Sequence, residues 1–509
     1  MAGYRCIMRL TCLAFVSLFL ILMVVGYQVL SEETEEGGQG SLDDLTEEQY
    51  QEPEDCPNIQ LYASYYHEIV PYIDSFETLS NPRPQDIQVP IILWWTPFTK
   101  EQGTFKRCGK QKCYFTENRK VRDFPHTKAI MFYGTDFNYL DLPTPRSPDD
   151  LWALLHEESP HNVWMLSHLP ALSLFNFTST FKRQSDYPIA TQYLSEVEEL
   201  ESRDFLVPTS EKSRLVKEEG YALLNYVQSD CGALSDRDHF VQMLQRHLVV
   251  DSYGACEHNK DLPKRLQDPI QGMIDEEFLN LLAKYKFTIA FENSVCDDYM
   301  TEKFWRPFVV GSVPIIFGSS KAKEFFPTNH SAIFVEDFES IEELVKLIKF
   351  LDQNDAEYEK YLSFKKAGGV TNQYLQQTIS EREWDITNAW ERSKPNFIEG
   401  FQCFVCKQLH EREKLVEKKP RIADINHYGC PEPKKFSDNP PGNLSRISDT
   451  YWSSPWSTGK YMAMALRYYI DNNITDYTEE DFMNRTIEMH NLHETAQVSY
   501  TTPDHHDDL

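Results

Sequence analysis

Several polar side chains in the second half of the chain have types and spacing that suit a phosphorylated sugar. Residues 285–319 read YKFTIAFENSVCDDYMTEKFWRPFVVGSVPIIFGSS. Lys303 can place a point charge on a diphosphate, and Tyr299 can donate its hydroxyl to the same phosphates. Asn293 and Glu302 can hydrogen-bond sugar or ribose hydroxyls. The set favours a sugar nucleotide ligand, although an ordinary buried unit with a solvated Glu-Lys pair has the same pattern.

These residues need a strand and a helix to position them. Residues 287–291 form an apolar run, and residues 313–317 form a second one with β-branched side chains. Between them, residues 300–310 carry helix formers, and Gly311 is a natural helix stop. The pattern predicts one βαβ unit of a parallel sheet. Ligands of such sheets lie beyond the carboxyl ends of the strands, so we expect one crevice to be faced by Glu292, Asn293, Tyr299, Glu302 and Lys303.

The same motif resembles a known family. FENS-x-x-x-DY-x-TEK, followed by GSVPIIFG, resembles the donor-site signature of the α1,3-fucosyltransferases, glycosyltransferase family 10. Residues 152–187 are similar to that family's acceptor-side blocks, and the similarity extends over about residues 88–407. Details such as YGTDF, HEESP, VDSYGAC, GGVTNQ and GFQCFVC are most similar to the divergent branch of α1,3-fucosyltransferases 10 and 11. That branch is also described as GDP-fucose protein O-fucosyltransferases.

The resemblance implies an α/β fold of the GT-B type, in which two Rossmann-like domains face each other across a cleft. Apolar runs at 89–95 and 129–133 predict buried strands of the first domain. Runs at 223–228 and 332–335 predict strands of the second domain, and residues 341–352 have helical periodicity.

The predicted organisation has six parts. They are a cytosolic tail at 1–9, a transmembrane signal-anchor at 10–30, an acidic stem at 31–87, an acceptor-side domain at 88–215, a GDP-fucose-binding domain at 216–395, and a cysteine-containing return segment with an acidic tail at 396–509.

The resemblance also implies roles for single residues in the inverting transfer of L-fucose from GDP-β-L-fucose. Glu158, at the family's E-S-P position, is the predicted general base, and Glu157 is the neighbour that could replace it. Arg237 is the predicted second ligand of the diphosphate beside Lys303, although it could instead pair with a neighbouring aspartate. Arg183 is a weaker donor-binding candidate.

Two pairs of aspartates leave a metal-dependent alternative open. Asp236 and Asp238 form a D-x-D motif, and Asp297 and Asp298 are adjacent. Because the cationic clamp can neutralise the diphosphate and the family resemblance implies metal independence, we expect no metal and no required cofactor. Transfer should then persist in excess EDTA.

Charge and hydropathy predict a membrane-anchored protein of the secretory pathway. With 79 acidic and 50 basic residues, the net charge of −29 argues against nucleic-acid binding. Residues 31–55 hold eleven acidic and no basic residues, which predicts a disordered stem. Residues 10–30 are uncharged and follow two arginines, so the positive-inside rule predicts a type II anchor, with a cleaved signal peptide as the alternative.

The cysteines have two interpretations. Cys403-x-x-Cys406 with His427-x-x-Cys430 has the spacing of a zinc site. In an oxidising lumen disulfides are favoured, and the resemblance implies that Cys108 and Cys113 pair with Cys403 and Cys406. Pairing of Cys231 with Cys256 is a further hypothesis. Nine cysteines follow the anchor, so at least one thiol, free or intermolecular, is left over.

Five N-x-S/T sequons agree with a lumenal location; they begin at Asn176, Asn329, Asn443, Asn473 and Asn484. Asn176 has the alternative of a structural role. The chain ends in His-Asp-Asp-Leu, close to a retrieval signal, which favours the endoplasmic reticulum membrane over the Golgi membrane.

The acceptor is the least constrained prediction. Pro307 should shorten or kink the helix that carries Lys303, and Cys296 and the long tail also depart from the commoner glycan-modifying members. These differences favour a Ser or Thr hydroxyl on a folded glycoprotein domain. N-acetylglucosamine on N-glycans or other glycoconjugates is the alternative, and an inactive lumenal client-binding protein is the second. The sequence does not determine the oligomeric state.

Overall fold

The structure is a computed structural model that describes residues 86–147, 149–268, 275–386, 394–415, 421–437 and 444–501. The predicted anchor, the acidic stem, Cys56 and the His-Asp-Asp-Leu end lie outside these residues. Among the described helices, none combines the length and the apolar character needed to cross a membrane.

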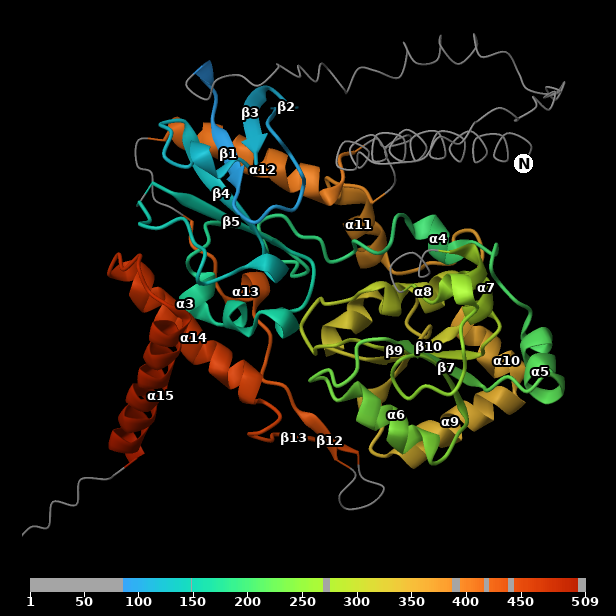
Figure 1. The fold of residues 1–509 in the computed structure, drawn as a ribbon. Coiled ribbons are helices and arrows are strands. Elements are labelled where there is room, and N and C mark those ends of the chain that lie inside the picture. Colours follow the sequence, from blue (N-terminus) through green and yellow to red (C-terminus); the bar gives the residue numbers. More distant parts are fainter. Residues whose placement is uncertain are drawn as a thin grey trace, which may run out of the picture. The chain divides into compact units, whose positions relative to one another are not determined.

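The first sheet has six strands in the order β2-β3-β1-β4-β5-β6 (Figure 1). They are β1 (Ile91–Trp94), β2 (Thr104–Cys108), β3 (Gln111–Thr116), β4 (Thr127–Tyr133), β5 (Leu151–His156) and β6 (Phe177–Thr180). All neighbours are parallel except β2, which pairs antiparallel with β3. The predictions at 89–95 and 129–133 are confirmed as β1 and β4.

Each face of the first sheet is covered by helices from distant parts of the chain. One face packs against α12 (Phe397–Glu413), through Phe401, Val405 and Leu409. The other face packs against α3 (Leu169–Leu172) and α14 (Ser454–Asp471). Figure 1 shows α12 and α14 beside this sheet although both come from the last quarter of the chain.

The second sheet has five parallel strands in the order β11-β10-β9-β7-β8. They are β7 (Leu224–Gln228), β8 (Val250–Gly254), β9 (Phe287–Phe291), β10 (Val313–Phe317) and β11 (Ile333–Phe334). The strand order reverses between β7 and β9, which is the position where open α/β sheets bind their ligands. The predicted strands at 223–228, 287–291, 313–317 and 332–335 are confirmed.

Helices cover both faces of the second sheet. One face carries α6 (Arg237–Gln245) and α9 (Ile341–Gln353), and the other carries α7 (Glu276–Ala283) and α8 (Glu302–Val310) (Figure 1). Smaller helices complete the layers: α4 (Val197–Glu201), α5 (Thr209–Glu218), α10 (Asp355–Tyr358) and α11 (Gln373–Glu381).

Helix α8 differs from the prediction at one point. Gly311 ends the helix in the left-handed conformation at φ 71°, as the sequence indicates. Pro307, however, lies inside the helix, which continues to Val310. The buried aromatic side chains Phe304 and Phe308 on either side pack into one cluster, and we attribute the continuation of the helix to that packing.

Four disulfides form among the described residues, and three of them connect distant segments. Cys108–Cys403 and Cys113–Cys406 join the first sheet to α12, and Cys231–Cys256 lies in the second sheet region; these three confirm the predicted pairs. Cys296–Cys430 is a fourth bond that the sequence did not indicate. The zinc alternative is wrong, because its three cysteines, 403, 406 and 430, are all consumed in disulfides.

The last described part of the chain contacts both sheets. It contains α13 (Ile425–Tyr428), the hairpin β12 (Lys435–Ser437) and β13 (Ser445–Ile447), α14, and α15 (Glu479–Thr501). Phe436 of the hairpin lies in the core of the second sheet, whereas Tyr428 and Leu466 lie in the core of the first.

Candidate active site

The start of helix α8 is capped from within the protein. Thr301 is the N-cap, and its hydroxyl accepts a hydrogen bond from the backbone N–H of Lys303. The buried carboxylate of Glu292 accepts from the Thr301 N–H (2.8 Å) and from its hydroxyl (2.8 Å). Burial raises the pKa of Glu292 to about 7. Glu292 therefore holds the helix start and does not face the crevice, which corrects the prediction.

Lys303 and Glu302 form an ion pair of 2.8 Å in the first turn of α8. Burial alone lowers the pKa of Lys303, but the Glu302 and Glu292 carboxylates outweigh it and raise that pKa overall. Burial likewise raises the pKa of Glu302, yet Lys303 and Arg306 hold it at about 2. Both side chains are therefore charged at neutral pH, beside a helix N-terminus that favours anions.

Arg237 begins α6 at the carboxyl end of β7, and it is only 1% exposed. Its guanidinium donates to the backbone oxygens of Asp230 (2.6 Å) and Phe291 (3.4 Å), and the Asp230 carboxylate lies 3.6 Å away. Its Nε is buried and has no partner among the described residues. Arg237 thus spans the ends of β7 and β9, and its Nε–H has no acceptor among the described residues.

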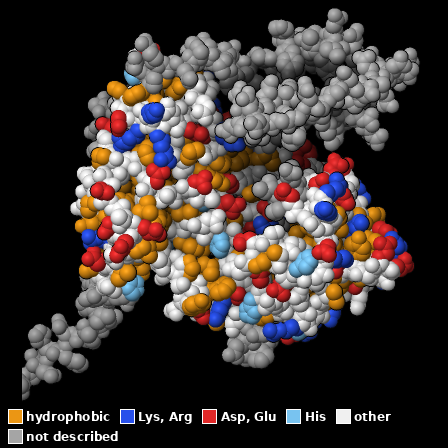
Figure 2. Space-filling model, in the orientation of Figure 1, with side chains coloured by type: hydrophobic (Ala, Val, Ile, Leu, Met, Phe, Trp, Pro, Cys, Tyr) orange, Lys and Arg blue, Asp and Glu red, His pale blue; other side chains and the backbone are white. Residues whose placement is uncertain are grey.

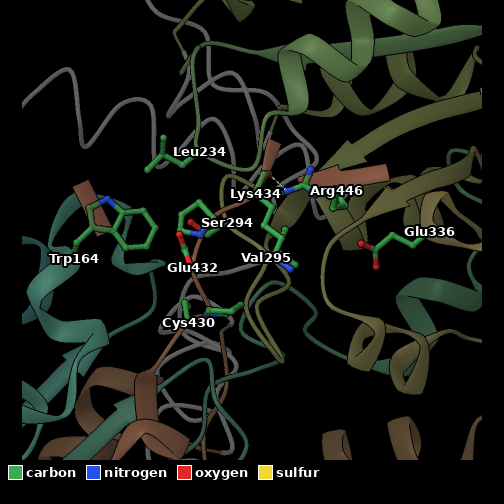
Figure 3. Close-up of a pocket in the computed structure, with 11 residues that line it drawn as sticks. Trp164, Leu234, Ser294, Val295, Glu336, Cys430, Glu432, Lys434 and Arg446 are labelled. Carbon is green, nitrogen blue, oxygen red and sulfur yellow. Dashed lines mark hydrogen bonds between the residues drawn. The ribbon is translucent and has the colours of Figure 1, made fainter. Parts of the chain in front are cut away.

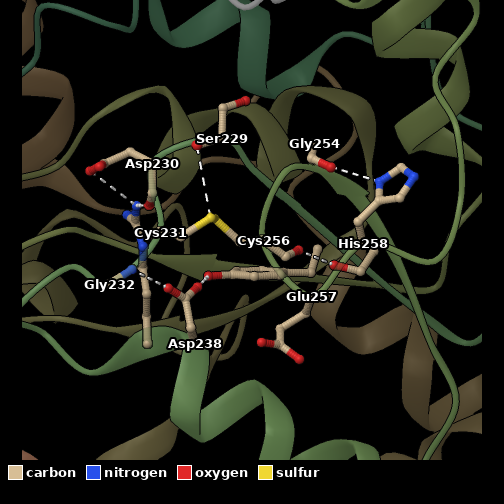
Figure 4. The surroundings of a disulfide bond; sticks show 12 residues. Ser229, Asp230, Cys231, Gly232, Asp238, Gly254, Cys256, Glu257 and His258 are labelled. Carbon is tan, nitrogen blue, oxygen red and sulfur yellow. Dashed lines mark hydrogen bonds and ion pairs between the residues drawn. A yellow bond between two sulfur atoms is a disulfide. The ribbon is translucent and has the colours of Figure 1, made fainter.

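The loop before Arg237 is fixed by the disulfide Cys231–Cys256 (Figure 4). It ties the loop after β7 to the residues that follow β8. Asp238 accepts from the Gly232 N–H (2.7 Å) and from the Tyr226 hydroxyl (2.6 Å), so the loop is also bonded to α6. These contacts fix the backbone from which Arg237 projects.

Glu158 lies in the loop after β5, and its carboxylate accepts a hydrogen bond from the Tyr299 hydroxyl at 2.9 Å. Tyr299 belongs to the loop before α8, so this bond joins the acceptor-side motif to the donor-side motif. The next residue repeats the connection, because the Ser159 hydroxyl donates to the side-chain oxygen of Asn293 at 2.8 Å. The two motifs, about 130 residues apart, therefore meet at two points.

Glu157 points to a different place. Its carboxylate accepts from the Tyr133 hydroxyl at 2.7 Å, within the first sheet, and burial raises its pKa. Alternate residues of an extended segment point in opposite directions, which explains why Glu157 and Glu158 have different surroundings. Of the two, Glu158 is the one that contacts the donor motif.

Arg183 also joins the two sheets, but its guanidinium is occupied. It forms ion pairs with Asp298 (2.5 Å) and Glu324 (2.6 Å), both from the second sheet region. Asp297 accepts instead from the Ser319 hydroxyl. Arg183 therefore lies in a structural ion-pair network, and Asp297 and Asp298 bond to separate partners.

The D-x-D motif is divided in the same way. Asp236 is the N-cap residue of α6 at φ 65°, and one of its oxygens accepts from the Phe436 N–H at 2.6 Å and from His239 at 3.1 Å. One carboxylate oxygen of Asp238 accepts from the Tyr226 hydroxyl, and the other accepts from the Gly232 N–H. The two carboxylates are thus held by different partners.

Two residues that the sequence interpretation missed, Tyr428 and His156, support the loop that carries Glu158. The Tyr428 hydroxyl donates to the backbone oxygen of Glu158 (3.1 Å) and lies 2.5 Å from Nδ1 of His156. Burial lowers the pKa of His156 to about 3, so the ring is neutral. If Nδ1–H of His156 donates to the Tyr428 oxygen, the Tyr428 hydroxyl is free to donate to Glu158. The Thr135 hydroxyl lies 3.0 Å from Nε2, the other ring nitrogen of His156. Two signals lay close to these residues: His156 begins the HEESP block, and Tyr428 lies between His427 and Cys430 of the zinc-like spacing.

The predicted sequon at Asn176 is structural. Its side-chain oxygen accepts from the Trp152 N–H (2.9 Å), and its side-chain nitrogen donates to the Arg421 oxygen (2.8 Å). The residue is 5% exposed. This supports the structural alternative over a glycosylation site.

Surface charge is mixed around these elements. On the face that Figure 2 shows, acidic and basic side chains of the described residues are interspersed, without a continuous basic patch. Together with the net charge of −29, this gives no electrostatic footprint for nucleic acid on that face.

Comparisons of the sequence with known proteins match one family. Residues 87–193 match the fucosyltransferase N-terminal family, and residues 218–428 match glycosyltransferase family 10 (fucosyltransferase), C-terminal. The GDP-fucose protein O-fucosyltransferase 3 of Xenopus tropicalis is 43% identical over 399 residues, covering 78% of this chain and 83% of the relative. The protein of the same name from Homo sapiens is 43% identical, covering 77% and 82%.

A solved α1,3-fucosyltransferase with GDP-fucose has a TM-score of 0.36 at 15% identity, covering 60% of this chain and 83% of that one. This likeness is too low to place any residue. The family matches and the sequence relatives are sufficient by themselves: the chain belongs to glycosyltransferase family 10, the fucosyltransferases.

Proposed function

We propose that this chain is an inverting fucosyltransferase that moves L-fucose from GDP-β-L-fucose onto a Ser or Thr hydroxyl of a folded secretory-pathway protein. The observation that carries the proposal is the hydrogen bond between Tyr299 and Glu158. It places a carboxylate from the first sheet against the loop whose helix carries Lys303. A base on one side and cations on the other are what a displacement at a sugar carbon requires.

Glu158 acts as the general base. It takes the proton of the acceptor hydroxyl while that oxygen attacks the anomeric carbon, and the bond from this carbon to the GDP oxygen breaks on the opposite face. The configuration is thereby inverted. General-base assistance is worth about 10²–10⁴-fold in rate. Tyr299 orients the carboxylate from the donor side, and Tyr428 fixes the backbone that carries it.

The leaving diphosphate is stabilised by fixed positive charge. Among the described residues, the Nε of Arg237 is buried without a partner and the ammonium group of Lys303 bonds only to Glu302. The α8 N-terminus adds its dipole. Asn293 and Glu302 are placed to bond hydroxyls of the fucose or ribose. Tyr299 belongs to the same donor loop, and Arg183 supports that loop through Asp298.

We further propose that the reaction needs no metal ion and no cofactor. Two cations and a helix N-terminus can neutralise the diphosphate, so a divalent ion would duplicate their role. The carboxylates of Asp236 and Asp238 are already bonded to protein groups. Transfer should continue in excess EDTA, and loss that manganese restores would overturn this part.

The proposed architecture is GT-B, with an acceptor-side domain at 88–215, a donor domain at 216–395 and a return segment at 396–509. Its support is that β1–β6 form one sheet and β7–β11 form another, with the donor and acceptor motifs on different sheets. The proposed location is the endoplasmic reticulum membrane, with a type II anchor at 10–30 and a lumenal catalytic part. The four disulfides support an oxidising compartment.

The test is transfer by the purified full chain, with labelled GDP-fucose and EDTA. One acceptor is a mixture of folded secretory proteins from cells that cannot make GDP-fucose, and the other is a set of N-acetylglucosamine-terminated glycans. Label on protein that survives removal of N-glycans supports the proposal. Label on glycans alone indicates the glycan activity, and no transfer despite GDP binding indicates an inactive binding protein.

Two neighbouring glutamates provide a matched pair of variants. Glu158→Gln should lower transfer by about 10²–10⁴-fold while GDP binding persists. Glu157→Gln is the control, because among the described residues its carboxylate bonds only to Tyr133, within the first sheet. Equal losses in the two variants would contradict the assignment of Glu158 as the base.

A further inference from the structure

A cavity of about 220 Å³ lies beside the candidate active site (Figure 3). Its walls come from several parts of the chain. Trp164 lies in the short helix after the E-S-P loop, Leu234 follows β7, and Ser294 and Val295 follow β9. The remaining walls include residues 430–434. Figure 3 shows Trp164 and Leu234 on one side and Ser294 and Val295 facing them.

The cavity is close to the base through bonded contacts. Ser159, next to Glu158, donates its hydroxyl to Asn293, and Asn293 is followed directly by Ser294 in the cavity wall. On another side the disulfide Cys296–Cys430 connects the same loop to the wall at Cys430. A ligand group in the cavity would therefore lie next to the place where an acceptor hydroxyl has to reach Glu158.

One residue that lines the cavity has a side-chain polar atom without a partner among the described residues. Ser294 is 5% exposed, and its Oγ is buried without a hydrogen bond among the described residues. A buried hydroxyl without a partner costs about 1–3 kcal/mol, so such groups usually have a ligand or water to bond. Ser294 thus marks a position where a bound molecule would place a donor or an acceptor.

The size of the cavity selects the kind of ligand. Pockets that enclose a whole small molecule measure roughly 300–1,000 Å³, so 220 Å³ suits a single amino-acid side chain better than a nucleotide. Trp164, Leu234 and Val295 make its walls largely apolar. Four charged residues also line it, two acidic and two basic: Glu336, Glu432, Lys434 and Arg446. These properties suit an apolar side chain of a polypeptide whose flanking residues are polar.

The wall formed by residues 430–434 and Arg446 is held by hydrogen bonds, although the match to the family ends at residue 428. Trp456 donates to the backbone oxygen of Cys430 (3.2 Å), and Trp452 donates to that of Leu234 (3.0 Å). Arg446 donates to the Ser235 oxygen at 3.0 Å and stacks on Phe436. The segment after the family match is therefore built into the cavity.

We propose that this cavity binds an apolar side chain of the protein acceptor close to the Ser or Thr that receives fucose. This inference rests on the proposed function. It assigns residues 430–434 and Arg446 to acceptor selection, with Ser294 bonding the backbone or side chain of the acceptor. The donor site lies outside the cavity, since neither Arg237 nor Lys303 lines it.

The test fills the cavity from two sides. Val295→Trp and Leu234→Trp each introduce a large side chain at a half-buried wall position. The acceptor is the folded secretory protein that carries most label with the wild-type full chain. Each variant should raise KM for this acceptor at least tenfold, whereas KM for GDP-fucose and hydrolysis of GDP-fucose in the absence of acceptor change less than twofold. Val249→Trp is the control, because Val249 is 74% exposed and precedes β8 at the opposite end of the strand.

The outcomes separate this inference from the proposed function. If the wild type labels protein and both filled variants keep its KM, the inference is wrong and the function stands. If the variants also lose GDP binding, the cavity belongs to the donor site and the inference is again wrong. Label on glycans alone, or no transfer by the wild type, refutes the proposed function and the inference together.

Discussion

Helix α8 has cationic side chains at both ends, and their bonding differs. At the start, Lys303 is paired with Glu302 and lies next to the loop that meets Glu158. At the end, Lys365 donates to the oxygens of Phe308 and Val309, and Lys212 donates to that of Gly311 (2.5 Å). The lysines at the end are 2% and 0% exposed.

The difference shows how a buried charge can be assigned to binding or to stability. Lys212 and Lys365 donate hydrogen bonds to backbone oxygens at the end of the helix, where the helix itself supplies too few donors. Their hydrogen bonds therefore stabilise the fold. The ammonium group of Lys303 donates to the side chain of Glu302 and to no backbone oxygen among the described residues, so we expect it to be available to an anion. Variants at the two ends should therefore alter different measurements.

The largest expected effect is on turnover at the start of the helix. Lys303→Ala should reduce kcat/KM for GDP-fucose by about 10²–10³-fold, since losing a fixed donor to a developing charge costs about 2.7–4 kcal/mol. The melting temperature should change little. Transfer kinetics and thermal unfolding of the same preparation check both statements. Turnover that stays within threefold of wild type would remove Lys303 from the donor site.

The next effect is on stability at the end of the helix. Lys365→Met keeps the aliphatic stem and leaves the Val309 oxygen without its donor, while the Phe308 oxygen keeps only the hydrogen bond from the Gly311 N–H. We expect a loss of about 2 kcal/mol in the free energy of unfolding. KM for GDP-fucose should be unchanged. Denaturant titration measures the first quantity, and a variant with normal stability but weakened donor binding would reverse the assignment of the two ends.

How far the sequence predicted this arrangement depended on how local each contact was. Strands β9 and β10, helix α8 and its Gly311 stop were predictable because apolar periodicity and helix-end signals act within a few residues. The meeting of the two motifs at Glu158 was only implied by the family resemblance. Tyr299 is an example of what the sequence alone did not show. Its residue type suggested a phosphate ligand, but its hydroxyl bonds to Glu158, 141 residues away.

Contacts made by the end of the chain could not be predicted. Helix α14 packs on the first sheet, Tyr428 bonds to the Glu158 loop, and Cys430 pairs with Cys296. Each contact joins residues more than a hundred positions apart, so no local pattern specifies it. The prediction that Glu292 faces the crevice was wrong for a related reason, since its role in capping α8 depends on the direction in which the loop after β9 turns.

The third prediction concerns pH and the end of the helix. Burial lowers the pKa of Lys212 to about 7 in the folded protein, whereas a lysine in the unfolded chain titrates near 10.4. Between these values the unfolded chain binds more protons, so the free energy of unfolding should rise with pH, by up to about 1.4 kcal/mol per pH unit. Lys212→Met should remove this part of the slope. Denaturant unfolding from pH 7.5 to 9.5 tests it, and equal slopes for the two proteins would contradict it.

The smallest expected effect returns to the start of the helix. Thr301→Val keeps the shape of the side chain and removes the hydroxyl that accepts from the Lys303 N–H and donates to Glu292. Loss of such a cap costs about 1 kcal/mol of stability. KM for GDP-fucose should rise only a few-fold, because the charge of Lys303 remains while the first turn of α8 loosens. Thr301→Ser, which keeps the hydroxyl, should restore both quantities. A Val variant with the same loss of turnover as Lys303→Ala would mean that the cap, rather than the lysine charge, is the main contribution of this helix end.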